Sequence, residues 1–503
     1  MPPMRANWQE GEVILVSGNT ATFDGQSSRY SFDGSKPRGE SVASTDRTTV
    51  PRPVPTATVP KEQLESAAVA PSSTQLAVAF SQGLDLAEGR QPGHAARVCY
   101  IALRLAEAAE APKELRQAFF YGALLHDAGA APASSELCRT LNLTEEALFA
   151  GKTGQSPQQL ALEIAPQQGP EVVEVLRAHL ELGANVADEL GLDEKVREAI
   201  GCHHERWDGQ GYPQALKGEA IPLAGRIVAA ADVIESLIGA ESNPLTARRN
   251  LVATLAEHSG RTIDPDLART ARDFVRSDEF WLGLHDGDAL RVLAKAVPPL
   301  KSDRKGDALV RFATVFANLA DAKGEHTAEH GTRTADIAKR LALAAGLNQV
   351  RARQVHIAAT LHDIGLLGVP ARVIAKPDIL SLAEMETMRK HPTLSQQILE
   401  DVPGLEDVSM WVGAHHERPD GKGYPELLDA EVIPIEARII ALADTYVALT
   451  SARPYRRALS DEDAQTVLLG GAGTQLDKKL VQLFCSQAVA TSSRSVPRAA
   501  RKR

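Results

Sequence analysis

Histidines and aspartates recur at one set of spacings in two separate parts of the chain. Within each set, a histidine precedes a His-Asp pair by 32 positions, a lone histidine precedes a His-His pair by 24, and an aspartate follows by 29. The first set contains His94, His126, Asp127, His179, His203, His204 and Asp232, and the second contains His330, His362, Asp363, His391, His415, His416 and Asp444. Ten of the 14 histidines belong to these sets, a regularity that isolated structural hydrogen bonds do not explain and that predicts ligand clusters.

The ligand types point to a particular chemistry. Imidazoles and carboxylates without thiolates suit Fe, Mn, Co, Ni or Zn and disfavour Ca or Mg alone. Five histidines and two aspartates are too many for one tetrahedral ion but suffice for two ions that share a carboxylate. Two ions about 3.5–4 Å apart clamp the oxygens of a phosphoryl group and activate water. Each set therefore predicts a metal-dependent phosphohydrolase site.

The matching spacings also predict a tandem duplication of one domain of about 180 to 230 residues. Only the gap between the His-Asp pair and the lone histidine differs, at 53 positions in the first half and 29 in the second. The extra residues fall near 131–165, where Pro132, Ser134 and Gly154 predict a loop. The expected organisation is a first domain over 73–300 and a second over 305–488.

The two ends of the chain differ from these domains. Residues 1–72 contain a strand-like run over 12–16, which suggests one small hairpin, and a Pro-rich stretch over 50–55. Such a composition builds little core and predicts a largely disordered segment. Residues 489–503 form a basic tail, predicted to be solvated.

Helical periodicity dominates both halves, and no train of alternating strands follows residue 75. A 3.6-residue pattern over 337–344 predicts a helix that ends at Gly346. Ser381 begins a capping-box pattern before an expected helix that carries Met385, Met388 and His391. Another helical run, from Val355 onward, should stop at 365. The fold class is therefore predicted to be all-α.

Composition excludes several classes of protein. The net charge is −10, which argues against a protein that coats a nucleic-acid duplex. No apolar run approaches the ~20 residues of a membrane span, and the start lacks a signal-peptide pattern. The four cysteines are scattered, which favours reduced thiols and a cytoplasmic location.

Each half resembles an HD-GYP domain, a branch of the HD phosphohydrolase superfamily. The phrases that carry the resemblance are HDIG at 362–365 and HHERPDGKGYP at 415–425, with HDAG at 126–129 and HHERWDGQGYP at 203–213. The resemblance covers about 75–300 and 308–487, and the longer phrase is highly specific.

The resemblance implies an all-helical fold that binds two metal ions per site, commonly iron or manganese, and hydrolysis of cyclic di-GMP to a linear product. It assigns one ion to His330, His362, Asp363 and Asp444, and a second ion to Asp363, His391, His415 and His416. The corresponding first-half ligands are His94, His126, Asp127 and Asp232 for one ion and Asp127, His179, His203 and His204 for the other. It implies that His362, Asp363 and Asp444 are catalytic.

Departures from the family pattern distinguish the halves. The usual lysine after His-Asp-x-Gly is replaced by Ala130 and Leu366, and loss of a cation beside a phosphate would slow catalysis. The family's Arg-Pro-Tyr-Arg phrase is kept at 453–456 but lost in the first half. The second half is therefore predicted to be catalytic and the first regulatory or vestigial. Expected substrate contacts are Arg453, Arg456, Tyr424 and Lys376.

Alternatives remain at this point. The protein could bind a cyclic dinucleotide as a sensor or signalling scaffold without turnover, or hydrolyse another cyclic nucleotide. Tyr424 could pack internally or face substrate. A homodimer or a signalling-protein partner is possible, and His326 could add a ligand, although no third ion is expected. The pair His285-Asp286 lies outside the repeated frame and predicts a surface turn.

Overall fold

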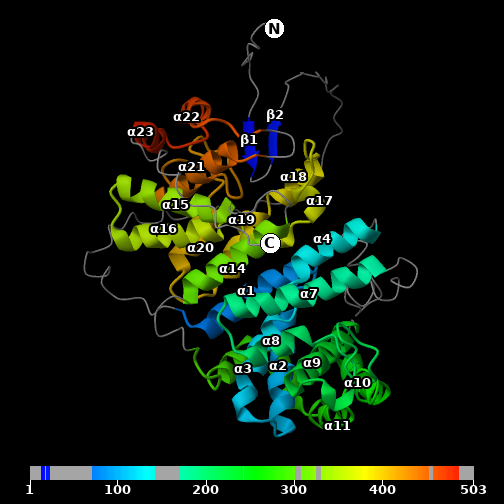
Figure 1. The fold of residues 1–503 in the computed structure, drawn as a ribbon. Helices are drawn as coiled ribbons and strands as arrows, with labels where there is room; N and C mark the ends of the chain where they lie inside the picture. The colour runs from blue at the N-terminus through cyan, green and yellow to red at the C-terminus, as the bar shows by residue number, and fades with distance from the viewer. Residues whose placement is uncertain are drawn as a thin grey trace, which may run out of the picture.

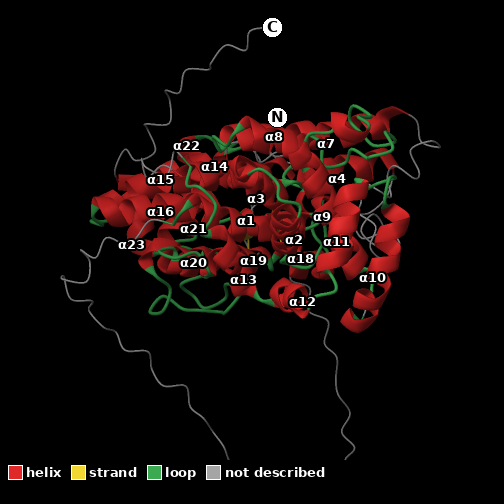
Figure 2. Cartoon of the chain, turned by 90° about the horizontal axis from the view of Figure 1, so that it is seen from below, coloured by secondary structure: helices red, strands yellow, loops and turns green. Residues whose placement is uncertain are grey.

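A computed structural model describes residues 13–16, 19–22, 71–141, 170–241, 243–300, 308–323, 330–452 and 457–486. Apart from one hairpin, the described elements are helices joined by turns and loops (Figures 1 and 2). No described helix combines the length and the apolar character needed to cross a membrane. These observations confirm the predicted all-α class.

The first half builds its site from helices that follow one another around a common core. Its elements are α1 (Ser73–Ala87), α2 (His94–Ala108), η2 (Lys113–Leu115), α3 (Arg116–Leu125), α4 (Ala130–Leu141), α7 (Pro170–Glu189), α8 (Glu194–Gly201), η3 (Gly218–Ala220), α9 (Leu223–Gly239), α10 (Pro244–His258), α11 (Pro265–Phe274), α12 (Asp278–His285) and α13 (Gly287–Ala294).

The second half repeats the order of the helices that bear the histidines and aspartates. Its elements are α14 (Ala308–Lys323), α15 (His330–Ala344), α16 (Gln349–Leu361), η5 (Ile364–Gly368), α17 (Ala371–Ile374), α18 (Leu382–Met388), α19 (His391–Glu400), α20 (Glu406–Gly413), α21 (Ile435–Thr450), α22 (Asp461–Gly470) and α23 (Lys478–Ser486).

The two halves meet along their first helices and share one hydrophobic core. The Phe80 ring on α1 lies 4.8 Å from that of Phe316 and 6.2 Å from that of Phe312, both on α14. All three rings are fully buried. In Figure 1, α1, α14 and α7 lie between the remaining helices of the two halves. Burial of this much aromatic surface holds the halves together as one body.

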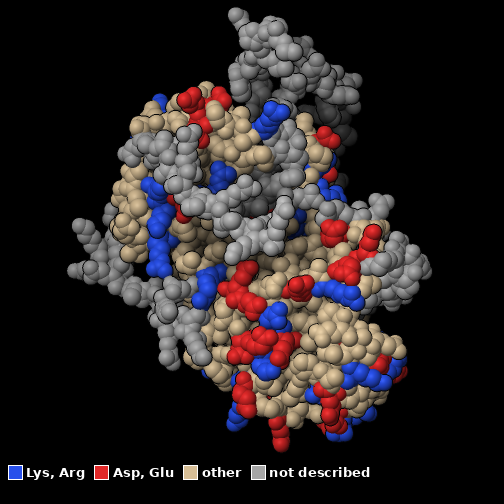
Figure 3. All heavy atoms as spheres, in the orientation of Figure 1, with Lys and Arg blue, Asp and Glu red and all other residues tan. Residues whose placement is uncertain are grey.

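The surface seen in Figure 3 is mixed in charge. Lysine and arginine side chains alternate with aspartate and glutamate over the described part of this face. This view agrees with a composition in which 55 basic and 65 acidic residues nearly balance.

Two predicted helix limits are confirmed, and two are wrong. α15 stops at Ala344, and Gly346 adopts the left-handed conformation (φ 91°) that ends a helix. Ser381 forms the predicted capping box with Glu384 at the start of α18. However, α18 ends at Met388 and His391 begins a separate helix, because Pro392 has no N–H to continue the ladder and instead suits the first turn of α19. The helix that starts at Gln349 also ends earlier than predicted, at Leu361.

The loop predicted near 131–165 is contradicted where it is described. Residues 130–141 form the helix α4, and Pro132 is tolerated because it lies in its first turn. Leu137 and Leu141 pack into a small apolar cluster with residues of α7 and with Tyr212. That burial stabilises a helix that local Pro and Ser content disfavours. Residues 142–169 lie outside the described residues.

The hairpin predicted near the start of the chain is confirmed. Strand β1 (Val13–Val16) pairs antiparallel with β2 (Asn19–Thr22), with Val13 opposite Thr22. At the other end of the predicted disordered segment, residues 71 and 72 are described and Ser72 caps α1. The rest of that segment and the basic tail lie outside the described residues. The domain boundaries stay predictions.

Candidate metal centres

The second-half histidines lie at helix ends, where a side chain can reach a common point. His330 and His391 begin α15 and α19, and His362 follows the last residue of α16. His415 and His416 follow α20, while Asp444 lies within α21. All of these side chains, together with Asp363, are buried.

Asp363 lies between two groups of ligands. Its Oδ2 atom is 3.3 Å from His362 Nε2 and 4.0 Å from His330 Nε2. Its Oδ1 atom is 3.2 Å from His391 Nε2 and 3.8 Å from His415 Nε2. One carboxylate thus faces both groups, as required of a ligand shared by two ions.

The two groups are compact. The ligand atoms of His330, His362 and Asp444 lie within 4.8 Å of one another, as do those of Asp363, His391, His415 and His416. His330 Nε2 is 2.9 Å from Asp444 Oδ1. The structure therefore brings together every second-half residue that the sequence spacing selected as a ligand.

Backbone carbonyls fix the histidine rings. The Nδ1 atom of His362 donates to Ala359 O at 2.8 Å, that of His391 to Met388 O at 2.8 Å, and that of His415 to Val412 O at 2.6 Å. Because a carbonyl only accepts, the hydrogen is on Nδ1 and a neutral ring presents Nε2 as a lone pair toward the cluster. This is the tautomer a metal ligand needs.

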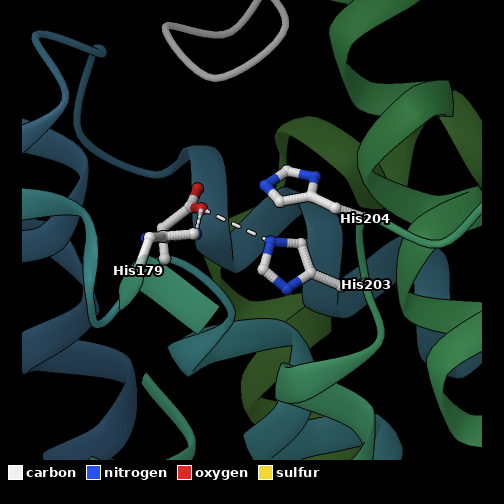
Figure 4. A group of neighbouring side chains, drawn as sticks. His179, His203 and His204 are labelled. Atoms are coloured by element: carbon white, nitrogen blue, oxygen red, sulfur yellow. Dashed lines mark ion pairs between the residues drawn. The ribbon is translucent and has the colours of Figure 1, made fainter. Parts of the chain in front are cut away.

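The first half repeats this geometry around Asp127. Its Oδ2 atom is 2.9 Å from His126 Nε2, while Oδ1 is 3.6 Å from His179 Nε2 and 3.7 Å from His203 Nε2. Figure 4 shows His179, His203 and His204 turned toward one region, with an ion pair drawn to His203. Asp232 Oδ1 completes the other group, 3.6 Å from His94 Nε2.

The donor sets fit a pair of cations. Buried polar atoms without a hydrogen-bond partner gather here: His179 Nε2, His204 Nε2 and Asp232 Oδ1 in the first half, and His416 Nε2 and Asp363 Oδ1 in the second. Such atoms are costly to bury unless something coordinates them. Nitrogen and oxygen donors in this number suit divalent transition metals.

Burial and neighbouring charges shift the pKa values of the histidines in each cluster in opposite directions. Burial lowers the pKa of His179 to about 4, and burial with neighbouring His391 lowers that of His416 to about 3. Burial alone would lower the pKa of His126, but the Asp127 carboxylate outweighs it and raises the value to about 10. The pKa of His362 is raised in the same way by Asp363. His179 and His416 are thus neutral at pH 7, while His126 and His362, which lie beside the shared carboxylates, hold a proton that a cation must displace.

A buried glutamate holds the Gly-Tyr-Pro loop. Glu417 Oε1 accepts from Glu426 N at 2.6 Å and Oε2 from Leu428 N at 2.9 Å. The loop turns closely under this carboxylate, since a Cβ on Gly423 would lie 2.5 Å from Arg418 N. Glu205 makes the same two bonds in the first half. The loop phrase is therefore a rigid structural unit.

Tyr424 packs against a candidate ligand. Its ring stacks on His416 with centroids 4.8 Å apart, and the Arg389 guanidinium lies 5.4 Å from the ring centroid. Burial, with the charges of Asp363 and Asp444, raises the pKa of Tyr424 well above its ordinary value. The contact fits the packing interpretation, and the phenol stays a neutral hydrogen-bond donor beside the cluster.

The side chains at two other positions singled out from the sequence have partners outside the ligand groups, and three further residues are not described. Lys376 Nζ is bound to Glu384 Oε2 at 2.6 Å, and Leu366 is buried in an apolar cluster with Val369 and Met388. Arg453, Arg456 and His326 lie outside the described residues. His285 and Asp286 are exposed, as predicted, but His285 ends α12 and α13 begins at Gly287, so the chain turns at Asp286 alone.

Sequence reasoning missed a pair of supporting aspartates. Asp85 accepts from Gly93 N at 2.7 Å and from Ala95 N at 3.0 Å, and Asp321 accepts from Gly331 N at 3.4 Å. Each carboxylate thereby anchors the start of the helix whose first residue is His94 or His330. Each aspartate stands nine positions before its histidine, so comparing the two repeats could have identified the pair from the sequence.

Removal of metal is expected to lower the melting temperature. At an ion concentration of about 100 Kd, binding adds about 2.7 kcal/mol and raises Tm by about 5–10 °C. Because His126 and His362 hold protons that the ion displaces, the increase should be larger at pH 8 than at pH 6. Thermal unfolding with Mn²⁺ or with chelator, at both pH values, measures this. A Tm that is the same with Mn²⁺ and with chelator would contradict metal binding. In the double variant Asp127→Ala, Asp363→Ala, Mn²⁺ should raise the Tm only slightly.

Comparison with known proteins agrees with the geometry. The HD domain family model matches residues 135–267 and 314–480, more than half of the chain. The chain is 29% identical over 428 residues to 3'3'-cGAMP-specific phosphodiesterase 3 of Vibrio cholerae, covering 80% of this chain and 92% of that protein. It is 39% identical over 154 residues to the cyclic di-GMP phosphodiesterase response regulator RpfG of Xanthomonas campestris, covering 30% of this chain and 40% of that protein.

A solved structure shares the architecture. The crystal structure of a cyclic GMP-AMP specific phosphodiesterase of V. cholerae, V-cGAP3, superposes with a TM-score of 0.59 at 28% identity. The match covers 84% of this chain and 98% of that one. With two clusters of HD-GYP spacing on one helical scaffold, this chain belongs to the HD domain family and carries two tandem domains of the HD-GYP type.

Proposed function

We propose that the chain is a metal-dependent phosphodiesterase that opens a cyclic dinucleotide at a binuclear site in its second half. The observation that carries the proposal is the position of Asp363, whose two oxygens face His362 at 3.3 Å and His391 at 3.2 Å. A shared carboxylate between two histidine groups is the arrangement that a two-ion phosphodiester hydrolase needs.

The side chains of the second half divide the work. His330, His362 and Asp444 would hold one ion, His391, His415 and His416 the other, and Asp363 both. Two bound divalent ions, with Fe or Mn the leading candidates, supply Lewis acidity toward the phosphate. Arg453 and Arg456 would balance phosphate charge, and the loop held by Glu417 keeps Tyr424 against His416.

The second half remains the proposed enzyme despite Leu366. That side chain is 1% exposed within an apolar cluster, so the cation of the usual lysine has to come from elsewhere. The kept arginines at 453 and 456 offer such cations, whereas the first half has Glu241 and Pro244 in the matching positions.

Two substrates have specific support. Cyclic di-GMP is the substrate named for RpfG, which matches at 39% identity over 154 residues. The relative that matches over 92% of its own length is named as specific for 3'3'-cGAMP. Because the match to that relative extends over both halves of this chain, 3'3'-cGAMP is the second candidate substrate.

The test is hydrolysis by protein loaded with Fe²⁺ or Mn²⁺ without oxygen. Cyclic di-GMP and 3'3'-cGAMP are supplied separately and in competition, and linear products are separated by chromatography. We expect turnover of at least one of them at ~100-fold or more above metal-depleted protein, as general for loss of an essential metal. Cyclic dinucleotide that binds without turnover would overturn the proposal in favour of a sensor. If the protein neither binds nor hydrolyses either dinucleotide, cyclic dinucleotides are excluded as its substrate class.

A further inference from the structure

A buried carboxylate holds one candidate ligand of the first half in a way that no other described ligand is held. His94 Nδ1 donates to Glu235 Oε2 at 2.6 Å, and the two side chains are 3% and 6% exposed. Glu235 Oε1 in turn accepts from Arg97, at 2.8 Å from Nε and 2.6 Å from Nη2. The Arg90 guanidinium also lies 3.4 Å from His94 Nδ1, but Nδ1 carries one hydrogen and donates it to the carboxylate.

The ring is thereby aimed at the cluster. With Nδ1 bound to Glu235, His94 presents Nε2 toward Asp232 Oδ1, 3.6 Å away. The other ring anchors that the structure describes are carbonyls, such as Ala123 O for His126 and Ile200 O for His203. A carboxylate partner fixes the ring as a carbonyl does, but its charge also makes the imidazole a more basic ligand.

The second half lacks this carboxylate at the equivalent place. Glu235 stands three positions after Asp232, and Val447, which is fully buried, stands three after Asp444. His330 Nδ1 has no hydrogen-bond partner in the part of the chain that the structure describes. Arg333, three positions after His330 as Arg97 is after His94, turns instead to Ser451 Oγ at 2.8 Å and Thr450 Oγ1 at 3.2 Å.

We propose that Glu235, held in place by Arg97, is a positioning residue that makes the first half retain its metal more tightly than the second. The first half is then a functional metal-binding site that keeps its ions, and not a vestige of duplication. Partners of this kind change metal affinity by about 10- to 100-fold. The inference rests on the proposed metal sites and goes beyond them by ranking the two halves.

The experiment isolates the first site in an Asp363→Ala background. The Kd for Mn²⁺ is measured by competition with a chromophoric chelator, and bound metal per chain is counted. We expect Glu235→Gln to weaken binding by about 10- to 100-fold and Arg97→Leu to weaken it by less, because the carboxylate charge stays. The reciprocal variant, Val447→Glu with Asp127→Ala, should tighten the second site.

The outcomes separate the two proposals. Equal Kd values for Glu235→Gln and its parent, with equal helical content of the metal-free proteins, would overturn the role of Glu235. A parent Asp363→Ala protein that binds no metal would instead contradict the first metal site itself. A first site weaker than the second, measured in Asp127→Ala, would overturn the ranking of the halves even if Glu235→Gln weakens binding.

Discussion

Replacing Asp363 with alanine should abolish hydrolysis of the cyclic dinucleotide, with a fall in kcat of at least ~1000-fold, equal to about 4 kcal/mol of barrier. Both oxygens of this carboxylate contribute, one toward His330 and His362 and the other toward His391 and His415. Alanine removes a ligand from both ions at once and leaves buried imidazoles without their counter-charge. Initial rates from product chromatography, with bound metal counted in parallel, measure the effect.

The duplication provides a matched control. Asp127 has the same place in the first half, 2.9 Å from His126 Nε2, so Asp127→Ala carries the same local damage. If the second half is the enzyme, Asp127→Ala keeps turnover within about tenfold, because the second site retains all its ligands and only its support is disturbed. Turnover lost in Asp127→Ala and kept in Asp363→Ala would reverse the assignment of the halves. Asp286, the exposed aspartate of the bare His-Asp pair, gives a further control. Its side chain caps α13 by accepting from Asp288 N at 2.9 Å, so Asp286→Asn, which keeps a capping oxygen, should leave turnover unchanged.

The shared core explains why such effects must be measured on the whole chain. Gly83 on α1 faces η5, since a Cβ there would lie 3.0 Å from Leu367 Cδ1. Gly368 lies on the other side of this contact, and a Cβ there would be 3.5 Å from Leu86 Cβ. The first helix of one half therefore packs directly on the turn that follows His362-Asp363 in the other. Separating the halves would expose Phe80, Phe312 and Phe316 to water.

Sequence was sufficient for features set by local spacing. The two ligand sets and the duplication follow from residue types at fixed distances. Asp-Gly is also a typical turn sequence, and at 208–209 and 420–421 the glycines are left-handed, at φ 79° and 70°. The ligands converge because each lies at a helix end or on one helix face. The repeated spacing of the sequence already gives the positions of these residues.

Features set by distant contacts could not be predicted. Glu235 meets His94 from 141 positions away, and no local pattern shows that a glutamate on α9 supports a histidine on α2. The helix α4 was missed because its stability comes from packing on α7, which outweighs its Pro and Ser content. The sequence shows that Leu366 lacks the positive charge of the usual lysine, but only the fold shows that its side chain fills an apolar cluster.

Gly365→Ala should be the most damaging single-methyl change in the second half. Gly365 N donates to Ser395 Oγ at 2.8 Å, and that hydroxyl donates to His362 O at 2.8 Å. A Cβ at 365 would overlap His391 O and would lie 2.6 Å from Ser395 N. The absence of a side chain is what lets α19 approach the His-Asp turn closely enough for His391 to reach Asp363.

Two costs follow from that added methyl group. Overpacking against backbone atoms that cannot rotate away costs about 1–3 kcal/mol of unfolding free energy. Because relief requires α19 to move, His391 shifts relative to Asp363, and a displacement of about 1 Å in a catalytic site costs roughly 100-fold in rate. Urea unfolding and initial rates measure the two effects separately.

The controls use other glycines of the same chain. Gly470, at the end of α22, has nothing within 4 Å of a Cβ, so Gly470→Ala should leave stability and turnover nearly unchanged. Gly129 is the first-half counterpart, and its Cβ would overlap His179 O. Gly129→Ala should therefore destabilise the chain as Gly365→Ala does, yet keep most of the turnover. If both variants lost activity equally at a temperature where both stay folded, hydrolysis would depend on the geometry of both centres, and a single catalytic half would no longer describe the protein.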